Sequence, residues 1–239
     1  MNSSIISKNN NIECNVQDVL KLIAIIGMIF DHVAMAFYPK FVELRLPGRI
    51  SIPLFCFFAG YNLSSHIRYL ILFWGMMLTA AFYFLFNKIF INLLVGIFLG
   101  KILLLHIQKP RSLVYIHLAW LALATLIFLP SSYYFEASSI PLLFMIVGWL
   151  KKNNKQFNLY LFASFILYYY VSVIIWPEFL YGYKMIIIMM ELGITFILLN
   201  LNFKQPVSFN CRVLSRNLLS VYIGHLTIIF LILIYIHLT

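Results

Sequence analysis

Apolar runs of about 20 residues recur along most of this chain, and this feature most restricts what it can fold into. A run of that length is what one α-helix needs to cross a bilayer. Charged residues make up only 10% of the sequence and hydrophobic residues 63%, whereas a soluble domain carries about 25% charged residues. We therefore predict an all-α, polytopic membrane helical bundle.

About nine transmembrane helices are predicted, with eight to ten compatible with the pattern. They cover about 18–38, 48–63, 67–86, 89–107, 113–130, 138–150, 157–176, 183–202 and 214–238, of which 138–150 is short for a full span. The first 17 residues are polar and lack the basic start and short apolar core of a cleavable signal peptide. We expect a polar segment at 1–17, followed by one transmembrane domain at 18–239 whose first helix is an uncleaved anchor.

The distribution of loop charges predicts the orientation of the bundle. The excess of basic residues falls on the side of the N-terminus, which places that side in the cytoplasm. These residues are Lys8, Arg68, Lys109, Arg111, Lys151, Lys152, Lys155, Lys204, Arg212 and Arg216, against Lys40, Arg45, Arg49, Lys88 and Lys184 on the opposite side. The same bias accounts for the net charge of +10. No cluster of basic residues with interleaved aromatics suggests nucleic-acid binding.

The three cysteines carry no recognisable site pattern. Cys14, Cys56 and Cys211 show neither paired spacing nor the spacing of metal ligands. We therefore expect no disulfide framework, no zinc site and no other metal.

The first apolar run contains four ionisable side chains, Asp18, Lys21, Asp31 and His32. A charge at the centre of a membrane helix costs roughly 2.5 to 3.5 kcal/mol, and such residues usually mark a functional site. Lys21 and His32 lie about 20° apart around the helix and about 16 Å apart along it, so they share one stripe. Asp18 lies one turn before Lys21 and can pair with it. Asp31 points about 100° away from His32, although both can border one cavity.

His32 has two interpretations. A histidine in a water-poor cavity with acidic company suits general acid–base catalysis near neutral pH. Alternatively, it is a buried histidine satisfied by a backbone carbonyl of a neighbouring helix. The adjacent Asp31 and the in-line Lys21 favour the functional interpretation, because three such groups are difficult to accommodate in lipid.

Two arginines, Arg45 and Arg49, lead into the second apolar run. Their planar guanidinium groups are suited to binding phosphate or carboxylate. Ordinary flanking charge at the membrane interface is the alternative. Arg49 is the better functional candidate, because it lies only four residues before Pro53 and close to the membrane.

Polar residues in the last two runs are further candidates. Tyr222 and His225 lie one turn apart and share a face of the last helix. We treat both as supporting residues that either line the cavity or are merely buried. Glu191 is the lone acid of the eighth run and could pair with a cation such as Lys101.

The pattern Asp18-x-x-Lys21, followed by ten residues and His32, resembles the opening helix of the membrane acyltransferase-3 superfamily. The stretch from Gly48-Arg49 through Pro53-Leu-Phe to Gly60-Tyr61 is similar to that superfamily's second motif helix.

Together with Asp31-His32, these motifs resemble the TraX family more closely still. Asn92-Leu-Leu-Val-Gly96 is similar to a TraX helix, and Leu214 to His225 resembles the superfamily's closing Ser-x-Tyr-x-x-His helix. The TraX family is associated with conjugation and N-terminal acetylation of pilin, so the resemblance implies a membrane acyltransferase.

We therefore expect acetyl transfer from acetyl-CoA to an amine or hydroxyl acceptor, with a pilin or another cell-envelope protein as the acceptor that the resemblance implies. His32 would be the catalytic base and Asp31 would tune it. Lys21 would bind the polyanionic donor, whereas Arg49 and Arg45 would bind the acceptor or the developing oxyanion. Asp18, Tyr222 and His225 would support the site, and the remaining partners are acyl-CoA and the lipid bilayer.

Two other classes of function remain open. A proton-coupled transporter would use the Asp–His pair and Glu191 as a relay, although the two halves of the chain show no correspondence of the kind found in many transporters. A non-catalytic membrane scaffold would leave Lys21, Asp31 and His32 unexplained.

Overall fold

The computed structural model describes residues 14–38, 40–64, 66, 68–86, 91–107, 140–153, 184–207 and 217–238. The chain is mostly helical, which confirms the all-α prediction. The helices are α1 (Val16–Phe37), η1 (Val42–Arg45), α2 (Leu46–Arg49), α3 (Ser51–Tyr61), α4 (Tyr69–Phe86), α5 (Leu93–Ile107), α7 (Ile140–Lys152), α9 (Lys184–Asn200) and α11 (Leu218–Leu238). The predicted helices 113–130 and 157–176 lie outside the described residues.

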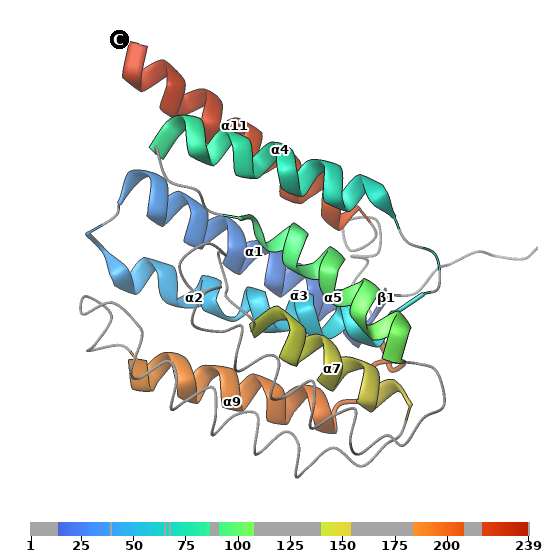
Figure 1. Ribbon diagram of the computed structural model, residues 1–239. Helices are drawn as coiled ribbons and strands as arrows, with labels where there is room; N and C mark the ends of the chain where they lie inside the picture. The colour runs from blue at the N-terminus through green and yellow to red at the C-terminus, as the bar shows by residue number, and fades with distance from the viewer. Residues whose placement is uncertain are drawn as a thin grey trace, which may run out of the picture.

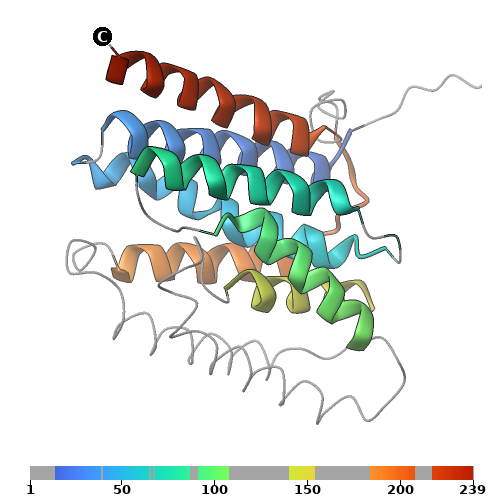
Figure 2. The same cartoon turned by 45° about the horizontal axis from the view of Figure 1, so that its top comes forward.

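The helices form a bundle in which two directions alternate (Figure 1). α1, α4 and α11 run one way, and α3, α5, α7 and α9 run the other way (Figures 1 and 2). We call the end where α1 begins the N-terminal end.

Two described helices are long and apolar enough to cross a membrane, namely α1 and, in α11, Leu218–Ile236. Shorter apolar helices lie at Tyr69–Phe84, Leu93–His106 and Met189–Asn200. The described residues thus support a possible membrane protein, while the predicted count of about nine spans is not confirmed.

The second predicted span is divided where its proline requires it. α2 ends at Arg49 and α3 begins at Ser51. The ring of Pro53 would clash with the carbonyl four residues earlier, at Arg49, in a continuous helix. The break therefore lies between the basic entrance of this segment and the apolar α3, which packs along α1 and α7.

The start of α1 is fixed by a capping box. Asn15 accepts a hydrogen bond from the backbone N–H of Asp18 at 3.0 Å, and Asp18 accepts one from the backbone N–H of Asn15 at 3.4 Å. The helix therefore begins at Val16, slightly before the predicted start at residue 18, because the two side chains satisfy N–H groups of the first turn.

A two-stranded antiparallel sheet ties this N-terminus to the segment before α11. β1 (Cys14–Asn15) pairs with β2 (Pro206–Val207), with Cys14 opposite Val207. Cys14 is disulfide-bonded, so the expectation that the cysteines form no disulfide is wrong. Cys56 is a free thiol, and the other cysteine of the chain, Cys211, lies outside the described residues. The spacing of the cysteines in the sequence carried no signal for this bond.

Candidate functional site

A pair of histidines joins the first and last helices. His32 Nδ1 lies 2.7 Å from His225 Nε2, and the two rings are inclined by only 6° with their centroids 5.0 Å apart. Because the nitrogens are much closer than the centroids, the rings meet edge to edge, as a hydrogen bond requires. His32 is 4% exposed and His225 is half-buried. The structure therefore brings together one predicted catalytic and one predicted supporting residue.

The backbone of α11 decides the direction of this hydrogen bond. His225 Nδ1 lies 3.0 Å from the carbonyl oxygen of Val221, which can only accept. In a neutral pair, His225 therefore donates from Nδ1 and accepts at Nε2, so that His32 donates from its own Nδ1. This assignment follows from the hydrogen-bond network. Nε2 of His32 is then the nitrogen that carries a lone pair, as the accepting atom of a general base must.

Tyr222 lies beside both imidazoles. Its ring meets the His32 ring edge-on at 6.1 Å and the His225 ring edge-on at 5.6 Å. Its hydroxyl lies 2.8 Å from Nδ2 and 3.1 Å from Oδ1 of Asn92, immediately before α5. Asn92 is 2% exposed. From the sequence, Tyr222 was predicted only as a supporting residue.

Asn92 is in turn connected to α4. Its backbone N–H donates to Thr79 Oγ1 at 3.0 Å, and the Thr79 hydroxyl donates to the carbonyl of Gly75 at 2.8 Å. Its side-chain Oδ1 accepts from the backbone N–H of Leu94 at 3.1 Å, which caps the start of α5. In the sequence, Asn92 was recognised only as part of a family motif, and Thr79 was not predicted. An Asn directly before an apolar run is the capping signal that could have drawn attention to Asn92.

Asp31 faces away from the histidine pair, as its angular separation from His32 predicted. Its Oδ1 accepts a hydrogen bond from Arg45 Nε at 2.9 Å, in a half-buried ion pair between α1 and η1. This contact needs Gly48, because a Cβ on that residue would lie 2.1 Å from the Cβ of Asp31. The orientation of His32 is thus set by His225, whereas Asp31 holds the α1–α2 corner.

The remaining predicted residues lie at the two ends of this arrangement. Lys21 is 4.0 Å from Asp18 and its Nζ lies 5.9 Å from the centre of the Phe58 ring. Lys21 thus lies at the N-terminal end, about three turns before His32. Arg49 is half-buried at the end of α2. Its expected role in binding the acceptor stays a prediction.

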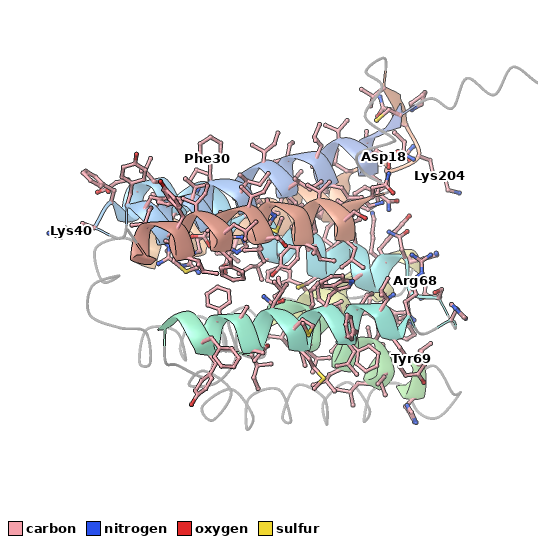
Figure 3. The ribbon with its side chains drawn as sticks, turned by 90° about the horizontal axis from the view of Figure 1, so that it is seen from above. Asp18, Phe30, Lys40, Arg68, Tyr69 and Lys204 are labelled. Atoms are coloured by element: carbon pink, nitrogen blue, oxygen red, sulfur yellow. The ribbon has the colours of Figure 1, made fainter. Side chains whose placement is uncertain are left out.

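Basic residues gather at the N-terminal end of the bundle. Figure 3 shows Arg68 and Lys204 at the same end as Asp18, with Lys40 at the opposite end. Lys151 also lies there, since its Nζ donates to the carbonyl of Leu199 near the end of α9. This placement agrees with the side assigned to Arg68, Lys151 and Lys204 from the sequence.

Two other predictions concern the partner of Glu191 and the absence of a metal site. In the part of the chain that the structure describes, no ion pair joins Glu191 to Lys101, although Glu191 is only 5% exposed. No group of three or more His, Cys, Asp or Glu side chains within the described ranges could hold a metal ion.

Comparison with known proteins identifies the family. The sequence profile described as TraX protein matches residues 16–233, from the first residue of α1 to far into α11. The chain belongs to the TraX family. A relative in Rickettsia prowazekii (strain Madrid E), named Uncharacterized protein RP591, is 28% identical over 232 residues, which covers 92% of this chain and 93% of that protein. No solved structure matches the chain.

Proposed function

We propose that this TraX-family protein is an integral membrane acyltransferase that moves an acetyl group from acetyl-CoA to an amine or hydroxyl acceptor. The hydrogen bond between His32 Nδ1 and His225 Nε2 carries this proposal. It holds a buried imidazole in the tautomer whose lone pair is on Nε2, and acyl transfer to a weakly acidic nucleophile requires such a basic nitrogen. The wider relation to the acyltransferase-3 superfamily is part of the same proposal.

In this mechanism His32 acts as the general base. Its Nε2 takes the proton from the acceptor nitrogen or oxygen as that atom attacks the thioester carbonyl. The new acetyl–acceptor bond forms and the carbon–sulfur bond breaks, after which His32 returns the proton to the departing thiolate. His225 stabilises the protonated imidazole of His32, because its Nε2 accepts the hydrogen bond from Nδ1 in both states. Tyr222 fills the space beside both rings.

The proposed setting is a multi-pass arrangement in the bacterial inner membrane. Large apolar side chains are exposed along the outer helices, for example Phe84 of α4, Phe196 of α9 and Tyr235 of α11. Such a surface suits lipid contact. The basic N-terminal end of the bundle would face the cytoplasm.

Cytoplasmic acetyl-CoA, a polyanion, would therefore meet the end of the bundle that carries basic residues. Lys21 fits this role, because its ammonium group is partly exposed there and shares a helix stripe with His32. Arg68 and Lys204 lie at the same end (Figure 3). These lysine and arginine side chains would hold the phosphates, while the thioester end extends towards His32.

The acceptor would approach from the opposite end. Arg45 and Arg49 follow α1 in the chain there, and Arg45 is already held by Asp31. Arg49 would bind the acceptor or stabilise the developing oxyanion. Family membership supports a pilin-like N-terminal amine or another cell-envelope group as the acceptor.

The direct test measures transfer of radiolabelled acetyl from acetyl-CoA, or its hydrolysis, by the purified protein in bilayers. His32→Ala should lower the rate by about 100-fold or more, as for loss of a general base. His106→Ala is a matched control. His106 Nδ1 lies 2.9 Å from the carbonyl oxygen of Ile102, four residues earlier, just as His225 Nδ1 lies 3.0 Å from that of Val221, but His106 is exposed on α5. Full activity of His32→Ala would remove His32 from the catalytic role.

A proton-coupled transporter is the second candidate function, and the pair of His32 and His225 favours it as well. Two hydrogen-bonded imidazoles that bridge α1 and α11 could pass a proton between helices. Substrate uptake into proteoliposomes that requires a pH gradient and is lost in His32→Ala, without acetyl-CoA turnover, would support the transporter over the enzyme.

A further inference from the structure

α11 packs through one narrow face, in which Leu226 and Phe230 join a buried cluster with α1, α4 and α5. Much of this helix is exposed, including Ile228, Leu231 and Tyr235. In a bilayer, lipid tails are as apolar as the side chains that they touch, so apolar burial distinguishes poorly between the faces of a helix. Polar contacts with neighbouring helices therefore have a large part in setting its rotation.

Two such contacts lie one turn apart on α11. His225 bonds to His32 of α1, and Tyr222 bonds to Asn92 at the start of α5. A helical rotation of about 20° moves a side-chain atom about 6 Å from the axis by about 2 Å. That displacement is enough to break a hydrogen bond of 2.7 Å between His32 and His225. The Tyr222–Asn92 contact restricts this rotation.

The carboxamide of Asn92 has a defined orientation. Oδ1 accepts from the backbone N–H of Leu94, so this end of the amide is the oxygen and Nδ2 is the donor to Tyr222. The backbone of Asn92 is held by the Thr79 hydroxyl of α4. Tyr222 is thus bonded to a group that both α4 and α5 hold in place.

We propose that Asn92 is the positioning residue of the histidine pair. Through the hydroxyl of Tyr222 it fixes the rotation of α11, so that His225 Nε2 meets His32 Nδ1. Asn92 acts through Tyr222 and His225 on the imidazole of His32. The consequence for turnover rests on the proposed acyltransferase function, whereas the consequence for the imidazole hydrogen bond does not.

Two variants separate this role from helix capping. Asn92→Ser keeps a side-chain oxygen that can cap α5 but is too short to reach Tyr222. Tyr222→Phe keeps the ring beside both imidazoles and removes only the hydroxyl. Thr227→Ala is the matched control, because it removes an exposed hydroxyl of α11 that bonds only within its own helix, to the carbonyl of Ile223.

The experiment combines two readouts on the full-length protein in bilayers. Nitrogen-15 NMR of labelled histidines reports the N–H···N hydrogen bond, assigned by its loss in His225→Ala. Kinetics report kcat and the KM for acetyl-CoA. We expect both variants to lose the hydrogen-bond signal and to lower kcat by about 10- to 100-fold with KM unchanged, since misplacement of a catalytic group by about 1 Å can cost 100-fold. The kcat of the double variant should be no lower than that of the less active single variant, because the two residues act as one unit.

Retention of the signal and of kcat in both Asn92→Ser and Tyr222→Phe would overturn the proposal. So would a wild-type protein without the N–H···N signal, or an equal loss in Thr227→Ala. If the wild-type protein keeps the signal but transfers no acetyl group, the acyltransferase proposal fails. The NMR comparison of the variants then still decides whether Asn92 positions the pair.

Discussion

The contact between α1 and α2 at Gly48 leads to a quantitative prediction. A Cβ on Gly48 would lie 2.1 Å from the Cβ and 2.9 Å from the Cγ of Asp31, and 3.0 Å from the carbonyl oxygen of Gly27. Real Cβ atoms do not approach so closely, so Gly48→Ala must push α2 away from α1. Overpacking of this kind costs about 1 to 3 kcal/mol of stability. The shift also strains the Asp31–Arg45 ion pair, which spans the same corner.

Gly193→Ala supplies the matched control, because a Cβ on this α9 glycine would meet nothing within 4 Å. Within a helix, Ala is more favourable than Gly by about 0.5 to 1 kcal/mol. Unfolding of both variants and of the parent in detergent, followed by helix content over a denaturant series, measures the two changes. We expect Gly48→Ala to be less stable than the parent and Gly193→Ala to be equally or more stable. A Gly48→Ala protein as stable as Gly193→Ala would refute the close packing of α1 on α2.

Three further predictions address the site and its orientation. His225→Ala should lower kcat by about 100-fold while the KM for acetyl-CoA stays near the parent value, because the residue holds His32 and not the donor; steady-state kinetics measure this, and a change in KM alone would contradict it. Lys21→Ala should weaken acetyl-CoA binding by about 10-fold in an equilibrium titration, with a weaker effect at high salt, and unchanged affinity would remove Lys21 from the donor site. A cysteine in place of the exposed Lys204, which lies at the N-terminal end, should react with a membrane-impermeant thiol reagent only after the inner membrane is opened, because the proposed orientation places this end in the cytoplasm; labelling above the parent level before the membrane is opened would instead place the N-terminal end in the periplasm.

The helical architecture could be predicted from the sequence because its signal is local. The apolar runs predicted each described long helix, and Asn15-x-x-Asp18 is itself a capping signal. The separation of Asp31 from His32 also followed from helix geometry, and the structure places Asp31 on Arg45 and His32 on His225. Helical periodicity was therefore sufficient to predict the features that lie within a single helix.

The contacts between distant segments could not be predicted in this way. His32 and His225 are 193 positions apart, and nothing in either local pattern shows which helices become neighbours. The pairing of β1 with β2 was missed for the same reason, because two-residue strands leave no period to detect. Thr79 was missed since a threonine in an apolar helix usually bonds to its own backbone, as it also does here.

The antiparallel pairing of β1 with β2 has a consequence for how the protein is made. The strand that holds the start of α1 lies at residues 206–207, so it is synthesised long after the first helix. α11 follows only after this strand and brings His225 to His32. During synthesis the site therefore does not exist in any nascent chain that lacks its last helix. A premature stop before α11 leaves His32 without His225, so such a product lacks the histidine pair that the proposed activity requires, whatever its stability.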